Sequence, residues 1–142
     1  MKQGMRDQTI LGFDFGTKKI GVAIGQTVTR TATALTLLEA QNGEPKWEDL
    51  AKIIQTWRPA SLVVGRPLNM DGTTQVLTEL AESFAHKLES HTSLPVYLID
   101  ERLSTVEARA NLFEKGGYRA LSRKNVDAAA AQIILQDWLN QL

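Results

Sequence analysis

The sequence contains no cysteine, which excludes disulfide bonds and metal sites built from thiolates. It also lacks any apolar run near the roughly 20 residues that a membrane-spanning helix needs, and residues 1–8 are mostly polar. We therefore expect a cytoplasmic protein that is neither embedded in a membrane nor secreted by an ordinary signal.

The chain also lacks a net charge, because 16 basic residues balance 16 acidic ones. A general affinity for polyanions is therefore not predicted from the total. The distribution is more informative, since residues 102–124 hold six basic side chains and only two acidic ones, and Lys18 and Lys19 lie together in an earlier turn. This pattern predicts a local phosphate-binding surface, with an ordinary solvated helix face and loop as the alternative.

The length and apolar content predict one domain that spans residues 1–142. A chain of 142 residues, of which 43% are hydrophobic, can form one core but is too short for two ordinary domains. Hydrophobic spacing predicts strands at residues 9–15, 20–25, 32–38, 61–65 and 96–99, a loop at 41–45, and helices at 47–57, 74–90, 105–114 and 123–139. The apolar stripe of the second of these helices comprises Val76, Leu77, Leu80, Ala81, Phe84 and Leu88.

The order of these elements predicts an α/β protein with a ribonuclease H-like fold, a five-stranded mixed sheet flanked by helices. The first two strands follow each other across the short turn GTKK and read as a hairpin. The later strands are separated by helices, and such crossovers are typical of parallel pairing. The first, fourth and fifth strands should then end at the same edge of the sheet, where ligands bind in α/β folds.

Acidic residues stand at three element ends that this topology would bring together. Asp14 ends the first strand, Asp100 and Glu101 end the fifth, and Asp127 lies in the first turn of the last helix, which Val126, Ala130, Ile133 and Ile134 would pack on the sheet. Clustered carboxylates are hard oxygen ligands for Mg²⁺ or Mn²⁺. We therefore predict Asp14, Glu101 and Asp127 as metal ligands and catalytic residues.

Each acid also has a purely structural reading. Asp14 could cap the turn at Gly16, Glu101 could pair with Arg102, and Asp127 could favour the positive end of its helix. Asp100 is a rival ligand, because alternation along a strand points it and Glu101 to opposite faces.

Four segments resemble, in order and spacing, the motif set of the YqgF (RuvX) family, Holliday junction resolvase-like proteins regarded as nucleases that process the 5′ end of pre-16S rRNA. They are DFGTKKIGVA, VVGRPLNMDGT, DERLSTVEA and KNVDAAAAQIILQ, and the resemblance covers residues 9–139. It implies the same fold, metal-dependent phosphodiester hydrolysis in ribosome biogenesis, a cytoplasmic location, and Asp14, Glu101 and Asp127 at the family's acidic positions. Many members carry an acid where this chain has Gln26 and an apolar residue where it has Arg66, so a metal ligand at Gln26 is not expected.

The expected partner is nucleic acid, either pre-rRNA or branched DNA, and the pre-ribosome is a further candidate for a chain that is a monomer or weak homodimer. The candidate nucleic-acid-binding residues are Lys18, Lys19, Arg102, Ser104, Thr105, Arg119, Arg123 and Lys124. Ser104 is equally suited to a plain helix cap. Alternatives are a DNA nuclease of the Holliday junction resolvase type, a non-catalytic RNA-binding assembly module, and an ATPase, since DFGTK also resembles the phosphate-binding hairpin of actin and Hsp70-like proteins.

Overall fold

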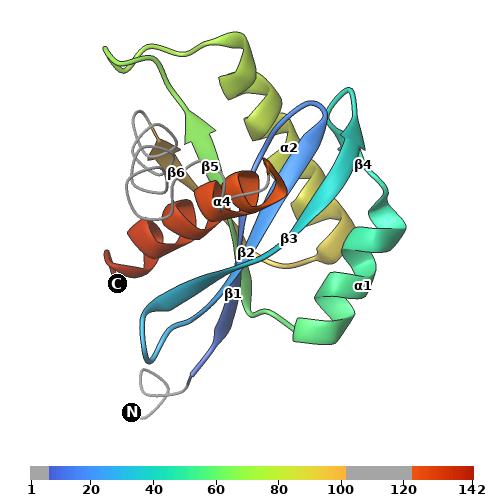
Figure 1. The fold of residues 1–142 in the computed structure, drawn as a ribbon, viewed down its shortest axis with the longest axis vertical. Helices are drawn as coiled ribbons and strands as arrows, with labels where there is room; N and C mark the ends of the chain where they lie inside the picture. Colours follow the sequence, from blue (N-terminus) through green and yellow to red (C-terminus); the bar gives the residue numbers. More distant parts are fainter. Residues whose placement is uncertain (1–6, 102–122) are drawn as a thin grey trace.

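The computed structural model describes residues 7–101 and 123–142, with side chains in the last helix described from residue 128 onward. Figure 1 shows these elements with their labels. The strands are β1 (Thr9–Asp14), β2 (Lys19–Gln26), β3 (Thr31–Gln41), β4 (Glu44–Pro45), β5 (Ser61–Pro67) and β6 (Val96–Glu101), and the helices are α1 (Trp47–Trp57), α2 (Val76–Thr92) and α4 (Arg123–Leu139). The helix predicted at residues 105–114 lies outside the described residues.

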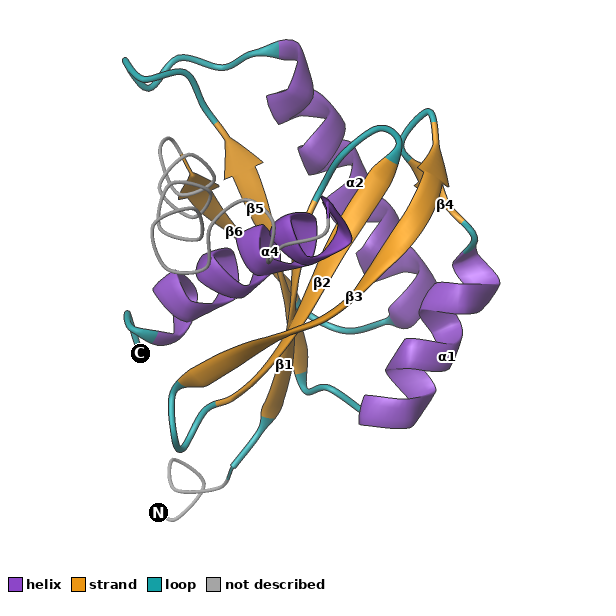
Figure 2. Ribbon diagram, in the orientation of Figure 1, coloured by secondary structure: helices purple, strands orange, loops and turns teal. Residues whose placement is uncertain are grey.

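The strands form one mixed sheet in the order β4-β3-β2-β1-β5-β6 (Figure 2). Strands β1 to β4 pair antiparallel along the sheet, whereas β1, β5 and β6 are parallel. The predicted hairpin and the predicted parallel pairing of the first, fourth and fifth strands are therefore both confirmed. The carboxyl ends of β1, β5 and β6 meet at one edge.

The prediction of five strands and of a loop at residues 41–45 was wrong in one element. Glu44 and Pro45 form β4 and pair with Gln41 and Ala40 at the end of β3. A two-residue strand is too short to show alternation, and proline is tolerated only at an edge. The hairpin therefore left no pattern in the sequence that would distinguish it from a loop.

Alternating side chains divide the core between the two faces of the sheet. Leu11 and Phe13 of β1 join the larger core under α1 and α2, while Ile10 joins the core under α4 (Figure 1). A Cβ atom at Gly12, on the α4 face, would lie 2.7 Å from the Cβ atom of Leu135. The helix α4 therefore lies unusually close to β1.

The packing of α4 agrees in part with the residues expected from its sequence. Ala130 and Ile134 are buried as predicted, but Ile133 is only half-buried. The core under α4 is instead formed with Ala131, Leu135 and Leu139. Val126 belongs to the residues whose side chains are not described. No helix of the described residues is long and apolar enough to cross a membrane.

The β3–β4 hairpin supports the turn that follows Asp14. The amide of Ala40 donates to the carbonyl of Lys18 at 2.8 Å, and the amide of Gly43 donates to the carbonyl of Thr17 at 2.9 Å. Gly43 has a positive φ of 83°, and a Cβ atom there would lie 2.9 Å from the ring of Phe15. The hairpin and the turn are thus held together by backbone hydrogen bonds and by a close contact that only glycine allows.

Glu44 connects this hairpin to α1 and α2, the helices on the face of the sheet opposite α4. Its carboxylate accepts a hydrogen bond from Nε1 of Trp47 at 3.0 Å and pairs with the ammonium of Lys87 in α2. The hydrogen bond from Lys87, and after it the one from Trp47, lowers the pKa of Glu44 below its ordinary value of 4.5. The ionised carboxylate therefore stabilises the fold above that pH, and the contribution is lost as the pH falls through the lowered pKa.

We predict that Glu44→Gln destabilises the protein at pH 7 by a few tenths to about 1 kcal/mol, since the pair is largely solvent-exposed. The difference from the wild-type protein should shrink as the pH falls through the lowered pKa of Glu44, because the wild-type side chain then also becomes neutral. Urea unfolding at a series of pH values from 7 downward measures it. A difference of the same size at every pH would show that the charge of Glu44 has no part in stability.

Candidate active site

Asp14 is the last residue of β1 and lies half-buried at the edge where the parallel strands end. Its neighbour Phe13 points into the core under α1 and α2, so alternation turns Asp14 to the α4 face. The turn after it begins at Gly16, where a Cβ atom would collide with the carbonyl oxygen of Lys19. Glycine at this position lets the chain reverse directly beside the carboxylate.

Glu101 is the last residue of β6 and lies on the same face as Asp14. A Cβ atom built on Gly65 of β5 would lie 2.9 Å from both Cδ and Oε2 of Glu101, and 2.7 Å from Cδ1 of Ile134 in α4. The carboxylate of Glu101 therefore occupies space over the β5 backbone that any other residue at position 65 would fill. Gly65 follows Val64, which pairs with Phe13, so it neighbours Asp14 across the sheet.

Asp100 points to the opposite face, as the alternation of β6 requires. Its Oδ1 atom accepts a hydrogen bond at 3.1 Å from Nη1 of Arg66, whose Nε donates to Glu82 of α2 at 2.6 Å. The hydrogen bond to Glu82, and after it the one to Asp100, raises the pKa of Arg66 above its ordinary value. Of the two candidate acids at this strand end, Glu101 is therefore the one that faces Gly65 and α4.

Asp127 lies within α4, but its side chain is outside the described part of the structure. The backbone position is informative by itself. It is one turn before Ala131, whose carbonyl oxygen would lie 3.4 Å from a Cβ atom at Gly12. Residues four apart share one side of a helix, so position 127 is on the same side of α4 as Ala131, which belongs to the core under that helix.

The donor set suits a hard divalent cation. Asp14 and Glu101 supply carboxylate oxygens on one face, and the missing side chain at Gly65 leaves room for one of them. Among the side chains that the structure describes, no three acidic, histidine or cysteine groups lie close enough to hold a metal. The predicted third ligand, Asp127, is not among those side chains, so its place in the site stays a prediction.

The basic candidates divide into described and undescribed residues. Lys18 and Lys19 are exposed on the turn after Asp14, and Lys19 lies two residues before Gly21, the partner of Asp14 in β2. Arg102, Ser104, Thr105 and Arg119 lie outside the described residues, as do the side chains of Arg123 and Lys124, which open α4. The alternative pairing of Glu101 with Arg102 lies there too.

Gln26 lies at the far end of the hairpin from Asp14. It pairs with Thr9, and its side chain accepts a hydrogen bond from the Thr9 hydroxyl at 3.2 Å. A ligand from this position could not reach the carboxylates at the other end of β1. The expectation that Gln26 takes no part in the site agrees with its location.

Sequence reasoning missed the roles of Gly65 and of Arg66. Gly65 was predicted only as the end of a strand. A single sequence does not reveal that a side chain of a neighbouring strand, here Glu101, lies over a glycine. Arg66 was noticed as an unusual residue at its position, but its two acidic partners lie 16 and 34 residues further along. The alternation of β6 was the one available signal that separated Asp100 from Glu101.

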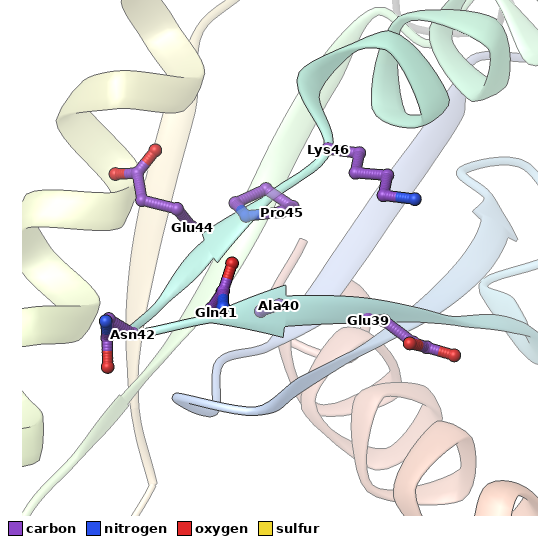
Figure 3. Close-up of a pocket in the computed structure, with 7 residues that line it drawn as sticks. All are labelled: Glu39, Ala40, Gln41, Asn42, Glu44, Pro45 and Lys46. Carbon is purple, nitrogen blue, oxygen red and sulfur yellow. The ribbon is translucent and has the colours of Figure 1, made fainter.

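A separate concavity of about 530 Å³ lies on the β3–β4 hairpin (Figure 3). It is lined by Glu39, Ala40, Gln41, Asn42, Glu44, Pro45 and Lys46. None of these is a predicted site residue, and the carboxylate of Glu44 is already engaged by Lys87 and Trp47. We therefore assign the candidate site to the carboxylates beside Gly65.

Known proteins resemble this chain over nearly its whole length. A curated protein of Yersinia pestis (strain Pestoides F), named "Putative pre-16S rRNA nuclease", is 58% identical over 137 residues, which cover 96% of this chain and 98% of the relative. A protein of the same name from Yersinia pseudotuberculosis serotype IB is 57% identical over the same length and shares.

Solved structures share the fold at low identity. They include Thermus thermophilus RuvC in complex with a Holliday junction substrate, with a TM-score of 0.56 and 16% identity over 94% of both chains. The fowlpox virus Holliday junction resolvase gives a TM-score of 0.57 and 13% identity over 94% of this chain and 99% of that one. The predicted ribonuclease H-like fold is thereby confirmed.

The family model RuvX, described as a Holliday junction resolvase, matches residues 8–141. With the curated relatives, this match confirms the prediction of a nuclease, a hydrolase of phosphodiester bonds. The chain therefore belongs to the RuvX family, which its four sequence motifs predicted.

Proposed function

We propose that this protein is a divalent-metal-dependent nuclease whose substrate is pre-16S rRNA, cleaved at its 5′ end. The observation that carries the proposal is the carboxylate of Glu101 lying over Gly65, on the face and at the strand ends where Asp14 also lies. The names of the curated relatives support the choice of substrate.

Asp14, Glu101 and Asp127 are the residues that would hold the metal. When bound, Mg²⁺ or Mn²⁺ activates a water molecule and neutralises the charge that develops on the phosphate. Asp14 ends a central strand and is fixed by the hairpin hydrogen bonds to the turn after it. Glu101 ends a strand that is paired with β5, and its carboxyl group lies over the backbone of Gly65. Both carboxylates therefore extend from paired strands rather than from free loops, which limits their movement before the substrate arrives.

The nucleic acid would approach along the turn that carries Lys18 and Lys19. These exposed ammonium groups follow Asp14 by four and five residues and would neutralise phosphates near the bond that is cleaved. Arg102, Ser104, Thr105, Arg119, Arg123 and Lys124 extend the proposed path. Because the protein has no net charge, binding should depend on these local groups and should weaken steeply with salt.

Branched DNA is the second candidate substrate, and the family description together with the fold of the junction resolvases favours it. The test compares cleavage of a pre-16S rRNA fragment and of a four-way DNA junction by the purified protein, with Mg²⁺ and with EDTA. We expect Mg²⁺-dependent cleavage of the RNA at its 5′ extension. Cleavage of the junction alone would overturn the proposed substrate, and cleavage in EDTA would overturn the metal.

The remaining parts of the proposal concern the setting of the enzyme. We propose a single domain over residues 1–142, acting as a monomer or weak homodimer in the cytoplasm, where the pre-ribosome would supply its substrate. The continuous sheet, which joins β1 to β6 without a break, supports the single domain. Sedimentation of the purified protein over a range of concentrations tests the state of assembly.

Asp14→Asn is expected to abolish cleavage while leaving the free energy of unfolding within about 1 kcal/mol of the wild-type value. The amide has nearly the same shape as the carboxylate and removes only the charge that the cation requires. Cleavage assays and thermal melting in metal-free buffer measure the two effects. Retained activity, or a melting temperature far below that of the wild-type protein, would mean that Asp14 is structural.

Gly65→Ala should nearly abolish cleavage, because the added Cβ atom would lie 2.9 Å from the Glu101 carboxyl group and displace it. Gly25→Ala is a matched control on the same face. Its Cβ atom would lie 2.9 Å from Leu139 and from the carbonyl of Thr31, far along the hairpin from Asp14. Both variants should lose about 1 to 3 kcal/mol of stability by overpacking. Equal activity of the two stable fractions would contradict the role of Glu101.

Lys18→Ala with Lys19→Ala should weaken RNA binding and flatten its salt dependence. Each single-stranded phosphate contact contributes about 0.7 to the slope of log affinity against log salt, so the slope should fall by about 1.4. Fluorescence anisotropy with a short RNA at several salt concentrations measures it. The control Lys46→Ala with Lys52→Ala makes the same change of charge at two exposed positions, the N-cap of α1 and a residue within it. Equal slopes in both double variants would move the binding path elsewhere.

A further inference from the structure

A branched ion pair joins the ends of β5 and β6 to α2, on the face opposite the carboxylate site. Arg66 of β5 donates to Glu82 of α2 and to Asp100 of β6, at 2.6 and 3.1 Å. The Arg66 side chain is 27% exposed, so it lies against the protein surface rather than extending into solvent. One guanidinium group therefore links three elements at the edge where the site lies.

Backbone contacts hold the same region from two further sides. The amide of Leu68, just after β5, donates to the carbonyl of Glu101 at 3.2 Å. The hydroxyl of Thr78, a fully buried residue of α2, donates to the carbonyl of Pro67. The main chain at Glu101 is thus fixed in position, and Ile99 and Tyr97 hold the middle of the strand by packing on the α4 side. The rotation of the last two residues, Asp100 and Glu101, is the part that remains to be fixed.

That rotation decides where the Glu101 carboxylate points. In the described sheet, β6 is the last strand and has β5 as its one paired neighbour. Consecutive side chains of a strand point to opposite faces. A contact that holds Asp100 on the α2 face therefore holds Glu101 on the α4 face, over Gly65. Arg66 provides that contact with Asp100, and Glu82 holds Arg66 in place from α2.

We propose that Arg66 is a positioning residue for the metal site, acting through Asp100 to keep the Glu101 carboxylate over Gly65. This inference rests on the proposed function, because it assumes that Glu101 holds the metal. The outer partners of metal ligands commonly affect affinity in this way by orienting the ligand.

The sign of the effect separates positioning from simple electrostatics. Arg66 is positively charged and lies on the other face of the sheet from the proposed cation, so its charge alone opposes cation binding. If charge were its only influence, removing it would tighten binding. If Arg66 orients Glu101, removing it weakens binding. Arg66→Met keeps most of the length of the side chain and discards the guanidinium group, so the two expectations have opposite directions.

The experiment measures Mn²⁺ binding to the purified full chain by electron paramagnetic resonance of free Mn²⁺, with no substrate and no turnover. The proteins are the wild type, Arg66→Met, Asp100→Ala and the double variant, with Lys52→Met on α1 as a control that removes one exposed positive charge. We expect Arg66→Met to bind Mn²⁺ about threefold more weakly than the wild type. The loss should be smaller than the roughly tenfold loss that is typical when a direct partner of a metal ligand is removed, because Arg66 acts through Asp100. The control should bind like the wild type.

The double variant tests whether Arg66 acts through Asp100. Residues that act through one contact have non-additive effects, so the double variant should bind no more weakly than Asp100→Ala alone. Thermal melting accompanies each measurement, and a folded Arg66→Lys variant, which keeps the charge but lacks the forked donors, should fall between the wild type and Arg66→Met.

Two results would overturn the inference while leaving the metal site intact. If Arg66→Met binds Mn²⁺ as tightly as the wild type or more tightly, Arg66 does not position Glu101 and influences the site only through its charge. Fully additive effects in the double variant would exclude Asp100 as the link. A wild-type protein that binds no Mn²⁺, or an Asp14→Asn variant that binds it equally well, would instead remove the proposed site and the inference together.

Discussion

A helix can lie close to a sheet only where the sheet presents small side chains, and the position of α4 depends on this constraint. Its face of the sheet carries Gly12, Ala23, Gly25 and Gly65 where the helix crosses. Any larger side chain at Gly12 would meet Leu135 directly. The same face carries the Glu101 carboxyl group at Gly65, where an added Cβ atom would also meet Ile134 of α4.

Much of this arrangement follows from local patterns in the sequence. The apolar runs identified the five longer strands, and the predicted bounds of the helices at 47–57 and 123–139 match α1 and α4. Alternation placed Asp100 and Glu101 on opposite faces without saying which face was which. That choice depends on Gly65 and Arg66 of β5 and on Glu82 of α2, which come from two other parts of the chain. Pairing across such distances is not encoded in the spacing of one segment.

The errors also have physical causes. Val76 and Leu80 were expected on the buried stripe of their helix, but they are 73% and 39% exposed. The structure begins α2 at Val76, so this residue lies at the open end of the helix, beyond the core formed by Ala81, Phe84 and Leu88. The loop predicted at residues 41–45 contains β4. The β3–β4 hairpin supports the turn after Asp14 through backbone hydrogen bonds to Thr17 and Lys18, and the pattern of side chains in a sequence does not reveal such bonds.

The parallel pairing of β1, β5 and β6 has a consequence for the order in which the candidate site is assembled during folding. Strands β1 to β3 are neighbours both in sequence and in the sheet, so they can associate early. Glu101 reaches Gly65 only after β5 has joined β1 and the edge strand β6 has joined β5. A chain that has formed only strands β1 to β3 therefore has Asp14 in its hairpin but does not yet have Glu101 over Gly65.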